Sequence, residues 1–450
     1  MNSKADSLNL PRKPNSDLGH LPGESGWPII GATYEFLTDT FGMSDRLYRK
    51  YGPIFRSRVL FQDSVVVLGP EGSAQVLNDS EQLFSSKMAW DPILDRLFPN
   101  GLMLRDFAEH RHHRRILQSA FKKPALQGYL DAMNPQLEQG VARFAKKKHF
   151  GFKPAIKSLL LDVAAEVFLG MDIGDEAAKI NQAFIDTMLG STAVVKVPNK
   201  LTAWGRALEG RKVLEAFVEK HIPEKRANPG PDFFSQICTA TDEDGNVFPD
   251  DAVRDHMIFL LFAAHDTTTS TLCSIVYLLA KHPQWQGRLH AEYAGLSAHL
   301  SYDEQSGLED TALVLKEGLR MYPPLPSIVR RTTRDTTILG YAIPANTSVS
   351  LSPLYSHYME DYWDKPFDFD PDRFAPERAE HKRNSHQWIP FGGGAHKCIG
   401  LNFAEIQVKL FLYHLLKNYR VSIPKGYEMK CRQVPLNFPV DDLNVTLTAR

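Results

Sequence analysis

The stretch that decides the fold reads Phe391-Gly392-Gly393-Gly394-Ala395-His396-Lys397-Cys398-Ile399-Gly400. It joins a glycine loop to a lone cysteine, and apolar residues then recur at helical spacing from Asn402 to Leu416. This order predicts a sulfur atom at a helix N-terminus, where backbone N–H groups and the helix dipole lower the pKa of a thiol. The sequence therefore predicts a stabilised thiolate at Cys398.

A thiolate in this setting is the type of ligand that binds a heme iron. The sulfur donates electron density that favours O–O cleavage, and glycines let the backbone pass close beneath a flat macrocycle. The alternatives are a buried structural cysteine and a glycine-rich phosphate loop. The phosphate loop is rejected because no βαβ pattern surrounds the glycines and no acidic residue follows at dinucleotide spacing. The structural cysteine stays open until other motifs are considered.

The most apolar stretch, from Met257 to Ala280, has polar residues at its centre. A charge there is unfavourable in lipid, so the pattern predicts a buried core helix and not a membrane span. Asp266 and Thr267 place an acid beside an alcohol, and a threonine hydroxyl can bond back to the i−4 carbonyl and distort the helix. The functional interpretation is a pair that holds dioxygen and delivers protons through water, and core polarity is the alternative.

Two further pairs lie at helical spacing. Glu317 and Arg320 share a helix face at i, i+3, a pattern that in isolation is usually a solvated surface pair. His110 and Arg114 share a face at i, i+4, and each can donate a hydrogen bond to a heme propionate. The three histidines between Glu109 and Arg115 also admit a zinc site, although no Glu or Cys completes it nearby in the sequence.

Taken together, these motifs resemble those of the cytochrome P450 superfamily. The cysteine stretch matches the heme-binding signature Phe-x-x-Gly-x-basic-x-Cys-x-Gly at every fixed position, with His396 where arginine is commoner. The segment Ala263–Thr268 is similar to the oxygen-activation motif of the family, with Ala264 in place of the usual glycine.

The resemblance extends to structural motifs. In the family, the residues at the Glu317 and Arg320 positions interact with the arginine of a Phe-x-Pro-x-Arg-Phe segment. That segment is here Phe369–Phe374. The implied role of this arrangement is support for the heme loop and not catalysis. The matches occur in the order of the family and span nearly the whole chain.

The fold implied by the resemblance is mainly α and triangular, with a minor β-sheet region and heme b between the long central helix and the cysteine loop. Cys398 is the implied axial ligand of the iron. The implied cofactor-binding residues are Cys398, His110, Arg114, Arg330, His396, Phe391, Gly394, Gly400 and Ala264. Arg331 is an alternative to Arg330 as the propionate partner.

The implied activity is a monooxygenase reaction that inserts one oxygen atom of O2 into a C–H bond. Thr267 is the implied catalytic alcohol, and Asp266 is the implied relay acid. Two alternatives are a peroxide-driven peroxygenase and a non-enzymatic heme-based sensor or lipophile-binding protein. The Asp266–Thr267 pair argues against both, because neither needs a proton relay.

The substrate and the electron donor follow from the same resemblance. By family analogy, apolar segments line the pocket, which predicts a small hydrophobic substrate such as a terpenoid, a steroid or a fatty acyl compound. These segments are residues 86–103, Leu261, Ala264, 326–329 and 436–438. No flavin or NAD fingerprint is visible, so we expect a separate ferredoxin or flavodoxin with its reductase. Its candidate docking patch is basic and comprises Arg111, Arg115, Lys122, Lys123 and Lys397, with a solvated surface as the alternative.

Composition limits the compartment and the partners. The 450 residues contain 52 Lys and Arg against 53 Asp and Glu, so no net field favours nucleic acid. Four dispersed cysteines match neither a disulfide scaffold nor a zinc site. The first 24 residues lack an apolar run fit for a signal or an anchor. We expect a cytoplasmic protein without an integral membrane anchor, with an N-terminal extension and Pro/Gly hinge at 1–31 and a single domain at 32–450.

Periodicity and turn residues predict the main elements. The expected elements are a helix at 33–50, a hairpin at 54–68 with its turn at 61–64, several helices between 109 and 221, a long helix that starts at Pro249-Asp250, strands within 328–349 and 431–447, and a helix at 402–416.

Overall fold

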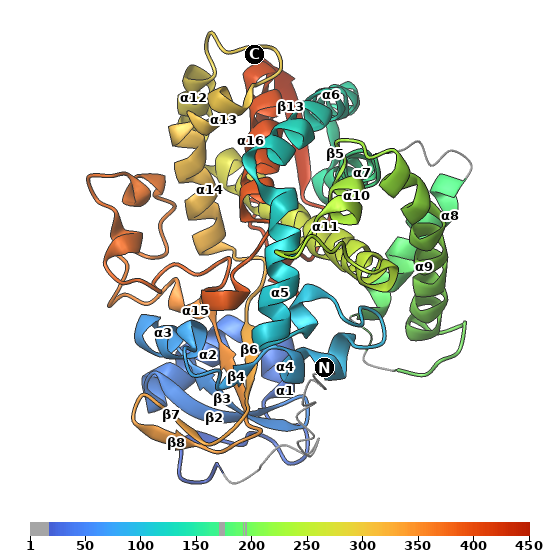
Figure 1. Cartoon of the computed structure of the whole chain (residues 1–450). Helices are drawn as coiled ribbons and strands as arrows, with labels where there is room; N and C mark the ends of the chain where they lie inside the picture. The colour runs from blue at the N-terminus through green and yellow to red at the C-terminus, as the bar shows by residue number, and fades with distance from the viewer. Residues whose placement is uncertain (1–17, 171–175, 192, 194–195) are drawn as a thin grey trace.

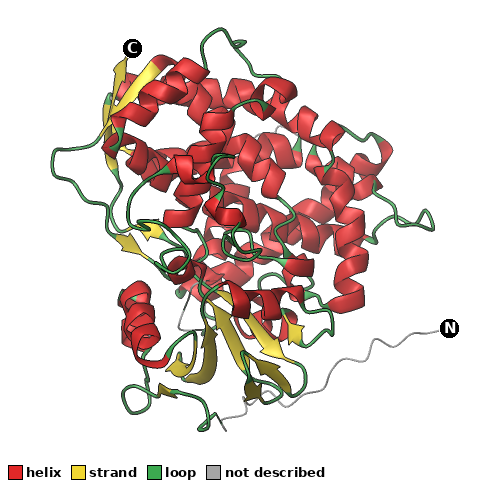
Figure 2. Cartoon of the chain, turned by 90° about the vertical axis from the view of Figure 1, so that its left-hand side faces the viewer, coloured by secondary structure: helices red, strands yellow, loops and turns green. Residues whose placement is uncertain are grey.

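The computed structural model describes residues 18–170, 176–191, 193 and 196–450. Helices make up most of it, and the larger sheet lies at one end (Figures 1 and 2). The helices are α1 (Thr33–Thr38), α2 (Thr40–Tyr51), α3 (Pro70–Asn78), α4 (Lys87–Leu94), α5 (Phe107–Leu117), α6 (Lys123–Lys147), α7 (Phe152–Ala164), α8 (Ala177–Ser191), α9 (Ala203–Ala227), α10 (Phe233–Thr239), α11 (Asp250–Lys281), α12 (Pro283–Glu292), α13 (Tyr302–Ser306), α14 (Glu309–Met321), α15 (Pro353–Ser356) and α16 (Leu401–Asn418).

The strands are short. They are β1 (Gly23–Glu24), β2 (Ile54–Val59), β3 (Gln62–Val67), β4 (Phe84–Ser85), β5 (His149–Gly151), β6 (Ile328–Thr332), β7 (Thr336–Ile338), β8 (Tyr341–Ile343), β9 (Ser348–Leu351), β10 (Tyr419–Ser422), β11 (Cys431–Arg432), β12 (Phe438–Pro439) and β13 (Asn444–Ala449). The larger sheet has the order β1-β2-β3-β9-β6-β4. This arrangement confirms the predicted fold class, mainly helical with minor sheets.

Helix α11 runs through the centre of the molecule (Figure 1). It begins directly after Pro249, and Asp250 and Asp251 occupy its first turn, where acidic residues favour the helix dipole. The predicted start of the long helix is therefore confirmed. Among the described helices, none combines the length and the apolar composition that a bilayer crossing requires.

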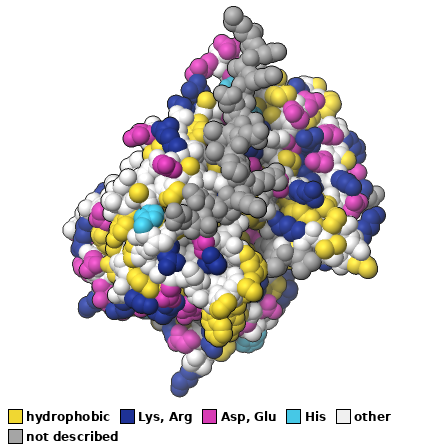
Figure 3. All heavy atoms as spheres, turned by 90° about the horizontal axis from the view of Figure 1, so that it is seen from below, with side chains coloured by type: hydrophobic (Ala, Val, Ile, Leu, Met, Phe, Trp, Pro, Cys, Tyr) yellow, Lys and Arg dark blue, Asp and Glu magenta, His cyan; other side chains and the backbone are white. Residues whose placement is uncertain are grey.

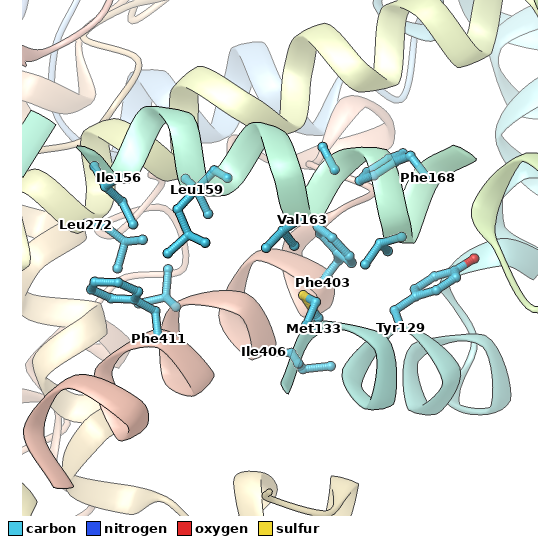
Figure 4. Packing of buried hydrophobic residues seen from close by; sticks show 14 of the residues in the cluster. Tyr129, Met133, Ile156, Leu159, Val163, Phe168, Leu272, Phe403, Ile406 and Phe411 are labelled. Carbon is cyan, nitrogen blue, oxygen red and sulfur yellow. The ribbon is translucent and has the colours of Figure 1, made fainter. Parts of the chain in front are cut away.

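The core around α11 is built from interlocking apolar side chains of α6, α7 and α16. Figure 4 shows Met133 of α6, Val163 of α7 and Phe403 of α16 directed toward one another, and Leu272 of α11 beside Phe411 of α16 further along. All five are buried. Close packing of this type holds the helices in fixed positions and so fixes the side chains that they carry toward the site.

Two local predictions are wrong. The helix predicted at 33–50 is divided into α1 and α2, because Asp39 leaves the helical conformation and its carboxylate accepts the N–H of Gly42 at 2.9 Å. The hairpin turn predicted at 61–64 lies at Leu60-Phe61 instead, because Val59 pairs with Gln62 and only two residues remain for the turn. The strands expected within 328–349 and 431–447 and the helix expected at 402–416 are confirmed.

Candidate functional site

The cysteine loop is closed by its own backbone and seated on α3. The N–H of Cys398 donates to the carbonyl of Phe391 at 2.9 Å, and α16 begins three residues after the cysteine. Gly394 has a positive φ of 61°, and a Cβ atom there would lie 1.7 Å from the carbonyl oxygen of Leu77. Only glycine lets the loop approach α3 this closely.

The Cys398 side chain has solvent-accessible surface, although it lies deep among protein atoms. Burial raises the pKa of the Cys398 thiol, while the N–H of Gly400 and the charges of Arg114 and Lys397 act in the opposite direction. The prediction of a lowered pKa is therefore wrong in its net direction, because desolvation outweighs the helix N-terminus. A metal cation at the sulfur supplies the charge that stabilises a thiolate.

Four basic side chains from three segments gather beside the loop, and we call them the cationic cluster: His110 and Arg114 of α5, Arg330 of β6, and His396. The rings of His110 and His396 are stacked, with centroids 3.8 Å apart. Burial, followed by neighbouring positive charges, lowers the pKa of His110 to about 4 and that of His396 to about 2. Both imidazoles are thus neutral near pH 7.

The structure separates Arg330 from Arg331. Successive side chains of a strand point to opposite faces, and the guanidinium of Arg331 donates to Asn346 at 3.4 Å and to Gln62 at 3.2 Å. Arg330 is 7% exposed, and its charge lowers the pKa of both histidines in the cationic cluster. Arg330 is therefore the arginine on the side of the cysteine loop.

The cationic cluster fits the carboxylates of a heme. Within the part of the chain that the structure describes, neither Arg114 nor Arg330 forms an ion pair. Asp106 lies 3.8 Å from His396 and accepts the N–H groups of Ser86 and Lys87; Asp106 and Asp79 interact with Arg330 only through space. Buried guanidinium groups require anionic partners. Heme propionates are such partners, and the cysteine sulfur lies within range of the charge of Arg114.

Helix α11 is less closely packed at its centre than on either side. Residues 261–264 and 266–267 are half-buried, whereas 255–260 and 268–279 are buried. Ala263 and Ala264 pack against the same hydrophobic cluster as Phe391 and Ile399 of the cysteine loop. Both segments therefore contact the large hydrophobic core of the helical part of the molecule.

The polar residues of α11 are fixed by hydrogen bonds. The hydroxyl of Thr267 donates to the carbonyl of Ala263 at 2.8 Å, the i−4 bond expected from the sequence, and α11 is continuous here. The carboxylate of Asp266 pairs with the ammonium of Lys157 at 2.9 Å and with Nδ1 of His265 at 3.1 Å. Burial opposes ionisation, but the hydrogen bond from His265 and the charge of Lys157 lower the pKa of Asp266.

Lys157 and His265 are site residues that sequence reasoning missed. Nε2 of His265 lies 2.9 Å from the carbonyl oxygen of Lys157, so the two residues join α7 to α11. Lys157 is distant in sequence from the motif, and a single exposed lysine gives no signal. The histidine was visible within the motif, but only the fold shows its partners.

A second group of charges, which we call the closed network, comprises Glu317, Arg320, Arg373 and Glu380, all with fully buried side chains. Glu317 accepts two hydrogen bonds from Arg320, at 2.7 and 2.9 Å, and one from Arg373 at 3.1 Å. The predicted link from Glu317 and Arg320 to the arginine of the 369–374 segment is confirmed. Glu380, which pairs with Arg373 at 2.9 Å, was not predicted.

His357 connects the closed network to the cysteine loop. Its Nε2 accepts the N–H of Ile389 at 3.0 Å, which leaves the Nδ1 hydrogen for the carbonyl of Arg320 at 3.1 Å. Burial lowers the pKa of His357 to about 3. The neutral imidazole thus ties α14 to the start of the loop that carries Cys398.

The histidines of α5 do not act together. His110 stacks on His396, whereas His113 lies 2.8 Å from Nε2 of His256 and stacks on Phe248. His112 is exposed. The zinc alternative for this segment therefore has no geometric support among the described residues, where no group of three potential ligands occurs.

Three features together point to a heme-thiolate protein: Cys398 just before α16, two guanidinium groups without an ion pair among the described residues beside the cysteine loop, and the acid–alcohol pair of α11. The family model described as "Cytochrome P450" matches residues 21–440. The chain belongs to the cytochrome P450 family; it is a P450 monooxygenase with a heme-thiolate cofactor.

Relatives match over almost the full chain. A protein of Mycobacterium tuberculosis named "Putative cytochrome P450 136" is 36% identical over 444 residues, which cover 97% of this chain and 90% of that protein. "Taxane 10-beta-hydroxylase" of Taxus cuspidata is 26% identical, over 95% of this chain and 90% of that protein. The solved structure "Retinoic acid bound cyanobacterial CYP120A1" has a TM-score of 0.86 at 27% identity, over 96% of this chain and 99% of that one.

Proposed function

We propose that this P450 hydroxylates a small hydrophobic compound at a C–H bond, with electrons from a separate ferredoxin or flavodoxin and its reductase. We place the reaction in the cytoplasm, in one catalytic unit over residues 32–450. The observation that carries the proposal is the half-buried, largely apolar centre of α11, which carries Asp266 and Thr267 beside its apolar residues.

Bound heme supplies the iron at which O2 is reduced and from which one oxygen atom is transferred. Cys398 would bind the iron through its sulfur, to which the N–H of Gly400 donates a hydrogen bond. Arg114 and Arg330 would hold the propionates by charge-assisted hydrogen bonds. The neutral His110 and His396 each have one N–H to add to this set.

We propose that Asp266 and Thr267 form the route by which protons reach the site. Lys157 is 43% exposed, and its ammonium contacts the largely buried carboxylate of Asp266, so the pair reaches from solvent to the centre of α11. The Thr267 hydroxyl sits one residue further along and donates to a backbone carbonyl, which leaves its oxygen free to accept. Asp266 passes protons inward, and the Thr267 hydroxyl directs their delivery.

Aromatic and aliphatic side chains support a lipophilic substrate. The rings of Phe98 and Phe262 are 4.2 Å apart, and Phe259 lies 6.3 Å from Phe98. The names of two relatives include a taxane, which is a polycyclic terpenoid, and retinoic acid, which is an isoprenoid acid. We therefore favour terpenoids, with steroids and fatty acyl compounds next. Type I optical shifts across such a panel test this, and binding restricted to polar, charged compounds contradicts it.

We propose a docking patch for the electron donor that is smaller than the patch of five basic residues expected from the sequence. Arg115 pairs with Glu243, and Lys123 pairs with Asp303 at 3.3 Å. Arg111, Lys122 and Lys397 are exposed and have no ion pair among the described residues. We assign the electrostatic contact to these three; a reduction rate that does not change with ionic strength contradicts it.

The Thr267→Ala variant tests the catalytic proposal. We expect product formation to fall by roughly a hundredfold, because a positioned proton donor is lost, while ferrous CO binding is retained. Thr271→Ala is the matched control, since Thr271 makes the same i−4 bond one turn later. Equal turnover with peroxide in the wild type and in Thr267→Ala would instead indicate a peroxygenase. An inert wild type with every donor would indicate a binding protein.

A further inference from the structure

A polar pocket lies between α6, the end of α7, the end of α9 and the loop that leads into α10. Its volume is about 370 Å³, which is within the range of sites for small organic molecules. We call it the α6–α9 pocket; its lining includes Tyr129, Glu166, Gly170, Glu224, Lys225 and Asp232. The described residues that line it belong neither to the cysteine loop nor to the cationic cluster. Binding there is therefore independent of the proposed reaction.

The hydroxyl of Tyr129 is buried at this pocket without a hydrogen-bond partner. Tyr129 is 1% exposed, and its oxygen has no partner among the described residues. Figure 4 shows its ring at the edge of the apolar cluster, with the oxygen directed away from the other labelled side chains. Burial, followed by the charge of Asp232, raises the pKa of Tyr129 far above its usual value. The hydroxyl therefore keeps its proton and is suited to a ligand that brings an acceptor.

A buried ion pair lines the same pocket. The ammonium of Lys225 pairs with Asp232 at 3.0 Å and donates to the carbonyl of Gly170 at 3.3 Å. The Asp232 carboxylate also accepts the N–H of Ser235 at 2.9 Å and its hydroxyl at 2.7 Å. Three donors thus engage the carboxylate, whereas Lys225 has a third N–H that neither of its bonds uses. The inner end of the pocket therefore presents two donors, from Tyr129 and Lys225.

The wall that α7 contributes is irregular. The helix continues as a π-helical turn over Ala165–Leu169 and ends at Gly170, which has a φ of 56°. A Cβ atom at Gly170 would lie 2.3 Å from Cβ of Asp232, so only glycine lets this carbonyl reach Lys225. π-helical turns are rare and frequently lie at functional sites. Together with the buried ion pair, these features indicate a site and not a packing defect.

The outer end of the pocket is acidic. Glu166 and Glu224 line it and are exposed, and Glu224 has only a long contact with His221 at 3.7 Å. Because Lys225 and Asp232 neutralise each other, the two glutamates give the pocket a net negative charge. Charges elsewhere are mixed, and basic and acidic side chains lie among one another on the face that Figure 3 shows. The preference for a cation is therefore local to this pocket.

We propose that the α6–α9 pocket binds a small polyhydroxylated amine. Its hydroxyl oxygens accept hydrogen bonds from Tyr129 and Lys225 at the inner end, and its ammonium group faces Glu166 and Glu224 at the outer end. A hydroxyl can also donate to the carbonyl of Gly170, which an ether oxygen cannot do. The glutamates repel an anion, and an apolar compound leaves the inner donors unpaired.

Calorimetric titration of the heme-loaded chain with D-glucosamine tests the proposal. The buffer is phosphate, because Tris is itself a polyhydroxylated amine. Glucose has the same ring without the charge, and glucuronate carries the opposite charge. We expect glucosamine to bind roughly tenfold more tightly than glucose, and glucuronate not to bind. No binding of glucosamine, or equal binding of all three sugars, overturns the proposal.

Tyr129→Phe separates a binding role from a structural one. Loss of a buried hydroxyl that has no partner leaves Tm unchanged or raises it, whereas the affinity for glucosamine falls roughly tenfold because one hydrogen bond is lost. Tyr293→Phe is the matched control, since its buried hydroxyl lies 2.9 Å from that of Thr311; it lowers Tm and keeps the affinity. Unchanged affinity in Tyr129→Phe, or an equal loss in both variants, overturns the proposal.

The double variant Glu166→Gln, Glu224→Gln tests the charge at the outer end. Both side chains are exposed, so the double variant folds like the wild type. It binds glucosamine only as tightly as glucose, because no carboxylate faces the ammonium group. A double variant that still prefers glucosamine overturns the proposed orientation of the ligand and, with it, the choice of an amine.

Discussion

The closed network and the cationic cluster both hold guanidinium groups in the interior, fully buried in the first and partly buried in the second, but only the closed network is electrically complete. In the closed network, Glu317 and Glu380 match Arg320 and Arg373 in number, and each guanidinium has a carboxylate partner. In the cationic cluster, the guanidinium groups of Arg114 and Arg330 have none within the described residues. A complete network supports structure, and an incomplete one is arranged for a ligand.

The two groups also differ in how they affect ionisation. In the cationic cluster, burial and mutual repulsion lower the pKa of His110 and His396, so the histidines stay neutral. An anionic ligand removes that repulsion. The comparison therefore predicts opposite responses to mutation: loss of stability in the closed network, and loss of heme binding in the cationic cluster.

Glu317→Gln breaks the closed network and has the largest expected effect on stability. Arg373 then keeps Glu380, whereas Arg320 loses its carboxylate partner. Removal of one partner of a buried pair costs about 3–5 kcal/mol. Denaturant unfolding of the ligand-free and heme-loaded forms measures it. A loss below about 1 kcal/mol in both forms contradicts the structural role of the network.

Arg330→Gln breaks the cationic cluster with little loss of stability in the ligand-free protein, because the guanidinium has no carboxylate partner among the described residues and loses only its bond to the carbonyl of Val329 at 2.8 Å. Heme dissociation accelerates by roughly ten- to a hundredfold, the equivalent of one charge-assisted hydrogen bond. Transfer of heme to an acceptor protein measures the rate. Arg331→Gln is the control, since Arg331 faces Asn346 and Gln62; equal heme loss in both variants contradicts the assignment of Arg330.

His357→Gln sharpens the comparison through pH. Burial lowers the pKa of His357 to about 3 in the folded protein, whereas an unfolded histidine titrates near about 6.5. The unfolded chain therefore binds the extra proton first, and stability falls as pH decreases from about 6.5 toward about 3, by about 1.4 kcal/mol per pH unit. Denaturant midpoints between neutral and acid pH measure this slope. In the His357→Gln variant, the pH dependence of the free energy of unfolding corresponds to one proton fewer taken up on unfolding. An unchanged pH dependence contradicts a neutral His357 in the folded protein.

Arg378→Ala has the smallest expected effect. Its guanidinium pairs with Asp370 at 2.7 Å and with Glu380 at 2.6 Å, but Arg378 is 40% exposed. Exposed pairs contribute about 0–1 kcal/mol, and Glu380 keeps Arg373. A thermal unfolding scan checks it, and a loss as large as that of Glu317→Gln shows that the network does not end at its buried members.

The sequence predicted the elements whose signal is periodic. The start of α11 and the helix after Cys398 follow from spacing. The link between Glu317, Arg320 and Arg373 follows from the resemblance to the family, since spacing alone favours a solvated surface pair. Partners from distant segments were not predictable. Glu380 stands among other charged residues, and nothing in the sequence marks it as the one that is fully buried.

Predictions based on local sequence rules, such as turn-residue preferences, were wrong where the structure departs from those rules. The Leu60-Phe61 turn lacks the Asn-Gly residues by which a type I′ turn is identified, so the turn was placed too late in the sequence. The pKa of Cys398 was predicted from the helix N-terminus alone, without the burial that only the fold reveals. The sequence could not distinguish Arg330 from Arg331, because only the fold shows which face of β6 each side chain occupies.

The central claim is that Cys398 is the thiolate ligand of a heme held by the cationic cluster. The ferrous–CO difference spectrum of the purified protein tests it most directly. The account predicts a Soret band at the long-wavelength position of thiolate ligation, and its absence in Cys398→Ser. A band at the position of histidine ligation, or an unchanged band in Cys398→Ser, would contradict it.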